Sequence, residues 1–194
     1  KRNFDKGACV NKDQGYSFFV AGHVYGKPGT KYNGIYEPFK SNGALNNCVF
    51  MPLGFLLGDA VVEASNYEFN ILKNDINSLG NNTNIYISPG NHEVGTGPYN
   101  AKRDIYVKNF GKTFKYLKYE NDLFILLDAN LHNWNIIGDQ LKMLKSLNSS
   151  KNRYKNVFIF SHQLIWIDSE NKKFSGLIAN SNEGKAKKLN FWNE

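Results

Sequence analysis

Short apolar segments bounded by polar residues and glycines recur along the chain and predict β-strands. They cover residues 16–21, 53–57, 84–88, 114–119, 123–128 and 156–161. The segments 123–128 and 156–161 are almost continuously apolar, which is typical of central strands covered on both faces.

Helical patterns separate these strands. Apolar residues spaced by three and four over residues 69–79 predict a helix that ends at Gly80. Leucines spaced by three predict a second helix over 138–148, and weaker patterns predict helices in 98–111 and 181–194. Strands that alternate with helices predict a layered α/β protein, and the absence of repeats or linkers predicts one domain over residues 1–194.

Composition narrows the class of protein. Of 194 residues, 41% are hydrophobic, which favours a folded domain, and no apolar run approaches the roughly 20 residues that span a bilayer. The net charge is +7, but the lysines are scattered, with one cluster at 185–188. This distribution does not favour nucleic-acid binding, and it suits a phosphate-bearing substrate equally well.

The cysteines and the N-terminus leave several properties open. Cys9 and Cys48 form no CxxC motif, so the sequence leaves open one disulfide or two thiols. The chain begins at Lys1 instead of methionine, so we expect that the natural N-terminus has been removed. Localisation and oligomeric state stay open, an extracytoplasmic location included.

Polar residues follow four of the predicted strands directly. His23, Asp59, the pair Asn91 and His92, and His162 stand at these positions. In a layered α/β protein, ligands bind at the carboxyl ends of the strands. A set of imidazoles, a carboxylate and an amide suits zinc, manganese or iron. Each residue alone has an ordinary structural interpretation, as a turn, a helix cap or a packed histidine, and the joint pattern favours a site.

The order of these residues resembles the motifs of the calcineurin-like metallophosphoesterases. The likeness rests on Gly58-Asp59, on Gly90-Asn91-His92-Glu93 and on His162 after an apolar strand, and it spans about residues 16–165. It implies a layered sandwich of two mixed β-sheets flanked by helices. It also implies two metal ions at the strand ends and the hydrolysis of phosphate esters.

The resemblance gives each residue an expected role. Asp59 would bridge the two metal ions, Asn91 and His162 would bind the second ion, and His23 would bind the first. His92 would lie beside the substrate phosphate as the catalytic proton donor, with Asn91 also contacting the substrate. These roles match the chemistry, because two cations stabilise the attacking and leaving oxygens and an imidazole titrates near working pH.

Two departures from the family pattern change the expected metal content. Ala21 stands where the family has the aspartate of the first block, and no His-x-His pair follows His162 before Glu194. We therefore expect that the chain is incomplete at its C-terminal side or that this block has changed. We also expect one well-supported position for a divalent ion, formed by Asp59, Asn91 and His162, because three protein ligands can hold an ion and two rarely do.

Two further features point to the surroundings of the site. Glu93 is expected to hold a site histidine in place, with an exposed acidic turn residue as the alternative. The glycine-rich segment 22–47 contains Tyr25 and is expected to line or cover the site, with a remote surface loop as the alternative.

Three hypotheses for function follow. The leading one is a metal-dependent phosphoesterase-like hydrolase that acts on an unidentified phosphate ester. The second is a non-catalytic relative that binds a phosphorylated or sugar ligand, and the third is a basic surface-binding protein. An SGNH-type esterase is excluded because Ala60, and not a nucleophilic serine, follows Asp59.

Overall fold

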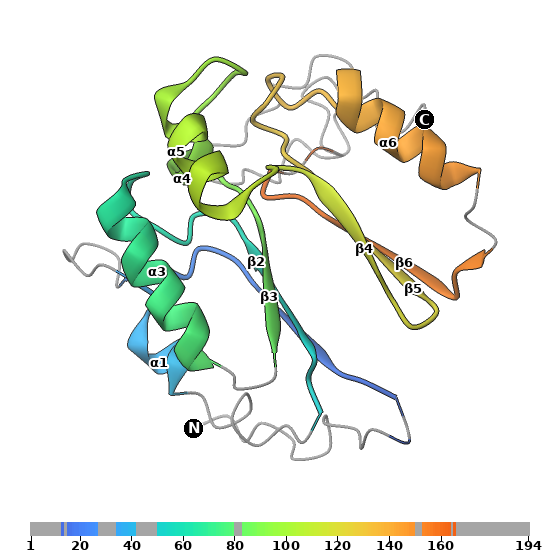
Figure 1. The fold of residues 1–194 in the computed structure, drawn as a ribbon, viewed down its shortest axis with the longest axis horizontal. Helices are drawn as coiled ribbons and strands as arrows, with labels where there is room; N and C mark the ends of the chain where they lie inside the picture. The colour runs from blue at the N-terminus through green and yellow to red at the C-terminus, as the bar shows by residue number, and fades with distance from the viewer. Residues whose placement is uncertain are drawn as a thin grey trace, which may run out of the picture.

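Two three-stranded sheets form the centre of the molecule. The computed structural model describes residues 13, 15–26, 34–41, 50–79, 83–149, 153–163 and 165 (Figure 1). In the first sheet, β1 (Phe18–Ala21), β2 (Leu53–Leu57) and β3 (Asn84–Ser88) are parallel neighbours in this order. In the second, β5 (Asp122–Leu126) lies between β4 (Lys115–Tyr119), which is antiparallel to it, and β6 (Asn156–Phe160), which is parallel.

Helices cover the outer faces of both sheets. Next to the first sheet lie α1 (Glu37–Lys40), α3 (Asn66–Leu79) and α5 (Ala101–Phe110), and α6 (Gly138–Asn148) lies next to the second (Figure 1). Phe69, Leu72 and Tyr106 from α3 and α5 pack with Leu56 and Ile87 of the first sheet. The short helix α4 (Asn91–Val94) begins three residues after β3 ends.

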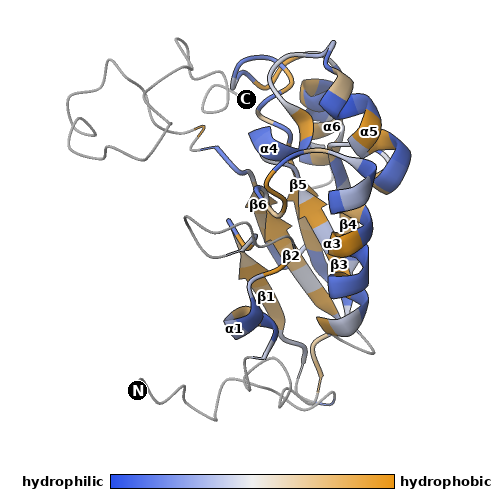
Figure 2. Cartoon of the chain, turned by 90° about the vertical axis from the view of Figure 1, so that its left-hand side faces the viewer, coloured by the Kyte–Doolittle hydropathy of each residue, from blue (hydrophilic) through white to orange (hydrophobic). Residues whose placement is uncertain are grey.

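The two sheets face each other across an aromatic core. Leu53, Phe55, Phe124 and Leu126 are buried between them, and the rings of Phe55 and Phe124 stack with centroids 5.0 Å apart. Figure 2 shows that hydrophobic residues dominate the strands, whereas α1 and α3 are largely hydrophilic on the side exposed to solvent. The layers therefore run helix, sheet, sheet, helix, which confirms the predicted layered α/β sandwich.

Most predicted elements agree closely with the structure. The bounds of β2, β3 and α6 match the prediction, and α5 confirms the weaker helical pattern. The second sheet is mixed as expected, whereas the three described strands of the first are all parallel, with the crossover through α3 returning the chain in the same direction. β5 ends at Leu126 instead of Asp128, because the Asp128 N–H donates to the Gln140 side chain at 2.9 Å and leaves the ladder.

Several predictions fall outside the described residues: the helix in 181–194, the helix end at Gly80, and the state of Cys9 and Cys48. The extent of the domain over 1–194 also stays a prediction. Within the described part of the chain, no helix has the length and apolar character needed to cross a membrane.

Candidate active site

Two glycines allow the ends of β2 and β3 to approach closely. Gly58 has a φ of +73°, and a Cβ atom there would lie closer than 3.0 Å to the Gly90 backbone and to His162 Nδ1. A Cβ atom on Gly90 would in turn collide with Asp59. Only glycine fits at these two positions, so the Gly-Asp and Gly-Asn-His segments serve a close contact between neighbouring strand ends.

Three histidines surround one oxygen of a buried aspartate at this edge. Asp59 Oδ2 lies 3.4 Å from His162 Nε2, 3.5 Å from His23 Nε2 and 4.0 Å from His92 Nε2. The Asp59 side chain is only 4% exposed, whereas His23 is 62% exposed. The four residues come from the ends of β1, β2, β3 and β6, so both sheets contribute to one cluster. We call His23, Asp59, His92 and His162 the histidine cluster.

Backbone carbonyls fix the protonation of two of these rings. His92 Nδ1 lies 2.7 Å from the Val62 carbonyl oxygen, and His162 Nδ1 lies 2.8 Å from that of Leu57. A carbonyl oxygen only accepts hydrogen bonds, so each Nδ1 carries the hydrogen. In the neutral rings Nε2 then has a free lone pair directed at the Asp59 side of the cluster, available to a proton or a metal ion.

Electrostatics couple Asp59 to the histidines. Burial acts to raise the pKa of Asp59, but the hydrogen bond with His162 and the positive charges of His162 and His92 outweigh it and lower that pKa below its usual value. Burial acts to lower the pKa of His162, but its hydrogen bond and attraction to Asp59 raise that pKa overall. The pair is thereby stabilised in its charged state.

Glu93 organises the backbone beneath the cluster. Its carboxylate is fully buried and accepts hydrogen bonds from four backbone N–H groups, those of Gly90 at 2.7 Å, Asp59 at 2.8 Å, Ala60 at 2.6 Å and Val61 at 3.1 Å. Burial and the nearby Asp59 raise the pKa of Glu93, and the backbone donors oppose that shift. Glu93 therefore holds the Gly-Asp turn against α4. Among the described residues, its hydrogen-bond partners are backbone N–H groups and include no imidazole ring. The alternative of an exposed turn residue is wrong, because Glu93 is buried.

Backbone conformation and ring contacts complete the site. His23 and Asp59 have φ angles of +56° and +49°, which are uncommon for residues with a side chain and cluster at functional sites. Tyr25 stacks on His92 with ring centroids 5.4 Å apart, so the described start of the segment 22–47 does contact the cluster. Asn91, the first residue of α4, is exposed beside His92, and its proposed ligand role stays a prediction.

A buried polar network behind the cluster was not predicted from the sequence. Arg103 of α5 pairs with Asp128 after β5, and the Asp128 carbonyl accepts a hydrogen bond from Gln140. Asn130 donates to the Pro89 carbonyl and accepts from Gln163, the neighbour of His162. Asp128 and Asn130 follow an apolar strand just as Asp59 does, and this shared position was the available signal.

The chemistry of the cluster fits a divalent ion. Imidazole nitrogen and carboxylate oxygen suit zinc, manganese and iron, and a histidine whose other ring nitrogen donates to a backbone carbonyl has the arrangement common among metal ligands. As the side chains stand, no group of three or more His, Cys, Asp and Glu residues in the described ranges is placed to hold an ion. Asp59 therefore contacts each histidine separately, and these side chains do not form a complete set of metal ligands.

Comparison with solved structures identifies the fold. The chain is similar to the purple acid phosphatase PPD1 from yellow lupin (Lupinus luteus) seeds, with a TM-score of 0.62 and 12% sequence identity. The match covers 88% of this chain and 33% of that protein, so the chain spans about a third of its length. No protein-family model and no curated protein matches the chain. The two packed sheets with flanking helices therefore share the fold of this purple acid phosphatase.

Proposed function

We propose that the protein is a metal-dependent phosphoesterase-like hydrolase that acts at the histidine cluster together with Asn91. The observation that carries this proposal is the approach of three imidazole Nε2 atoms to within 4.0 Å of one oxygen of the buried Asp59. A buried carboxylate needs a charged or hydrogen-bonding partner, and three imidazoles around one oxygen are more than a single ion pair requires, which supports a cation as the ligand.

The residues divide between holding a cation and handling a proton. Asp59, Asn91 and His162 would hold the divalent ion, and His23 lies close enough to Asp59 to serve as a further nitrogen ligand. A bound ion would supply a Lewis acid for phosphate oxygens and lower the pKa of a coordinated water. His92 has its Nδ1 hydrogen committed to the Val62 carbonyl, so Nε2 is the atom that can give a proton to a leaving oxygen.

Tyr25 extends the site toward the substrate. Its ring packs on both His92 and His23, with centroids 5.4 and 5.3 Å away. Burial and the negative charges of Asp59 and Glu93 raise the pKa of the Tyr25 phenol, so the hydroxyl keeps its proton and can donate to a phosphate oxygen. The wall that Tyr25 forms beside the cluster would orient the ester.

Hydrolysis of p-nitrophenyl phosphate tests the proposal. After chelation and the return of zinc or manganese, the wild type should release p-nitrophenol, and His92→Ala should lower kcat by about 100-fold or more, the usual contribution of a general acid. His132→Ala is the matched control, because the chain has four histidines and His132 is the one that lies outside the cluster. Equal rates for the two variants, with both folded, would contradict the assignment.

One observation favours a second candidate function, a non-catalytic protein that binds a phosphorylated or sugar ligand. Ala21 ends β1 where the family has an aspartate, and this position can supply no metal ligand. If inorganic phosphate binds to the wild type and is lost in His92→Ala, while no ester is hydrolysed with any of the metals, this second function would replace the first.

A further inference from the structure

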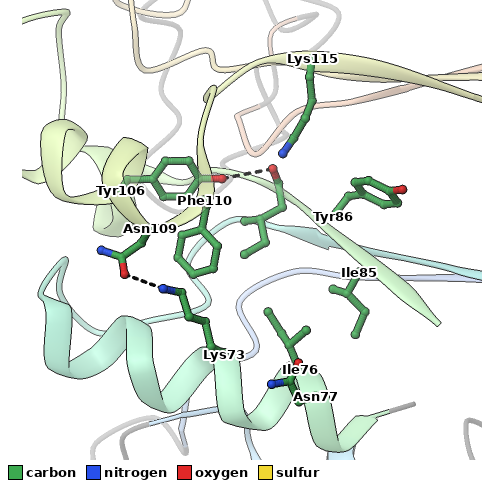
Figure 3. Close-up of a pocket in the computed structure, with 10 residues that line it drawn as sticks. Lys73, Ile76, Asn77, Ile85, Tyr86, Tyr106, Asn109, Phe110 and Lys115 are labelled. Carbon is green, nitrogen blue, oxygen red and sulfur yellow. Dashed lines mark hydrogen bonds between the residues drawn. The ribbon is translucent and has the colours of Figure 1, made fainter. Parts of the chain in front are cut away.

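A cavity of about 430 Å³ lies apart from the histidine cluster, between the two sheets' edge strands β3 and β4 and the helices α3 and α5 (Figure 3). None of the cluster residues lines it. Its volume falls within the range of small-molecule sites. The residues around it combine apolar walls with two lysines: Lys73, Ile76, Asn77, Ile85, Tyr86, Ile87, Tyr106, Asn109, Phe110 and Lys115.

Lys115 is the least compensated charge in this cavity. It lies at the start of β4, on the half-buried face of that strand, and Figure 3 shows its amine directed toward the middle of the cavity. Among the described residues no hydrogen bond or ion pair joins its Nζ to a partner. Burial lowers the pKa of Lys115, because a partly dehydrated ammonium without an acid is unfavourable. A bound anion would remove this penalty.

Lys73 supplies a second, oriented cation on the opposite wall. Its Nζ donates to Asn109 Oδ1 at 2.7 Å and lies 5.4 Å from the centroid of the Phe110 ring. The Asn109 amide is itself fixed, since its Nδ2 donates to Asn66 and to the Ile105 carbonyl. Lys73 thus keeps N–H donors for a ligand, and none of the described residues that line the cavity carries a carboxylate.

The walls between the lysines suit a flat apolar body. Ile76 and Ile85 form one side, and the Phe110 ring faces the space in Figure 3, whereas the Tyr86 ring lies on the other face of β3, where it stacks on Phe55. Tyr106 closes the inner end, where its hydroxyl donates to the Ile87 carbonyl at 3.4 Å. The ammonium of Lys115 and these apolar walls therefore fit a small organic acid with a flat apolar body.

We propose that this cavity binds a small organic acid, whose carboxylate meets Lys115 and whose flat apolar body packs against Ile76, Ile85 and Phe110, with Lys73 adding positive charge from the opposite wall. The site is independent of the proposed hydrolysis, because it shares no residue with the histidine cluster.

Calorimetric titration of the full chain with 2-naphthoate tests this proposal, with the uncharged 2-naphthamide as the matched ligand. Naphthoate should bind and naphthamide should bind at least about tenfold more weakly, the ratio expected when one charge-assisted hydrogen bond is lost. Lys115→Met should weaken naphthoate about tenfold, and Lys73→Met should weaken it in the same direction. Lys118→Met is the control, because Lys118 lies on the exposed face of the same strand.

Two additional measurements make the outcome decisive. Lys115→Met should unfold at or above the wild-type temperature, because it removes a partly buried unpaired charge while keeping the apolar stem. His92→Ala should bind naphthoate as the wild type does, which separates this cavity from the histidine cluster. Equal binding of naphthoate and naphthamide, equal loss in Lys118→Met and Lys115→Met, loss in His92→Ala, or no binding of naphthoate at millimolar concentration would each overturn the proposal.

Discussion

The Glu93 carboxylate accepts a hydrogen bond from the backbone N–H of Asp59 at 2.8 Å. Glu93, in the Gly-Asn-His-Glu segment, thereby holds the Gly-Asp turn that positions the Asp59 side chain. The same carboxylate also accepts from Ala60, Val61 and Gly90. The position of the Asp59 side chain in the histidine cluster thus depends on a buried residue 34 positions further along the chain.

Replacement of Glu93 by Gln should destabilise the protein strongly. The amide keeps one acceptor oxygen and places an NH₂ group against backbone N–H donors, so buried donors lose their partner. We expect a loss of about 3 kcal/mol or more in the free energy of unfolding. Urea denaturation measures it.

Glu63→Gln is the matched control for that change. Glu63 lies in the same loop region, is 71% exposed on its side chain and pairs with Lys102 at 3.6 Å. Its replacement should change the free energy of unfolding by less than about 0.5 kcal/mol. If Glu93→Gln is as mild as this control, the four backbone hydrogen bonds do not hold the turn.

Gly58→Ala tests the close approach of the two strand ends. Gly58 and Gly111 both have positive φ angles, +73° and +76°, but a Cβ atom on Gly111 would meet open space. Gly111→Ala should therefore show only the conformational penalty, about 1–2 kcal/mol. Gly58→Ala should cost clearly more, because its Cβ atom also collides with Gly90 and His162. Equal losses in thermal or urea unfolding would show that crowding at Gly58 is unimportant.

Much of the fold and the position of the cluster could be predicted from sequence, because local patterns determine them. Apolar segments of five or six residues gave the strands, and a polar residue directly after a parallel strand must lie at one edge of the sheet. The length of β5 could not be read in this way, since Asp128 leaves the ladder for a side chain on α6.

The hydrogen-bond partners of Glu93 could not be predicted from the sequence either. Motif spacing indicates which residues are near the site, but not whether a carboxylate turns toward an imidazole or toward backbone N–H groups. That choice depends on the left-handed turn at Gly58 and Asp59, which directs successive N–H groups at one point. The Arg103–Asp128 pair joins elements 25 residues apart and has no local pattern.

Tyr16→Phe should change the dependence of stability on pH. Burial and the hydrogen bond to Asp122 raise the pKa of the Tyr16 phenol above its usual value near 10. The unfolded chain therefore releases this proton at lower pH than the folded chain, and the stability from the neutral phenol is present below about pH 10 and lost as the pH rises beyond it.

The difference between wild type and Tyr16→Phe isolates that proton from the other tyrosines and lysines. We expect the advantage of the wild type in free energy of unfolding to be constant between pH 7 and 9 and to shrink between pH 10 and 11. An advantage that stays constant over the whole range would contradict the assigned role of the Tyr16–Asp122 hydrogen bond.

The metal content of the wild type and of Asp59→Asn, measured by elemental analysis after reconstitution with zinc or manganese, tests the central claim most directly. Asp59 is the carboxylate that all three histidines approach, so its replacement removes the charge that offsets a cation. We predict about one ion per wild-type chain and none in Asp59→Asn, with His132→Ala retaining the wild-type content. Two tightly held ions would contradict the single-site account, and no ion in the wild type, or an unchanged content in Asp59→Asn, would contradict the metal-dependent function itself.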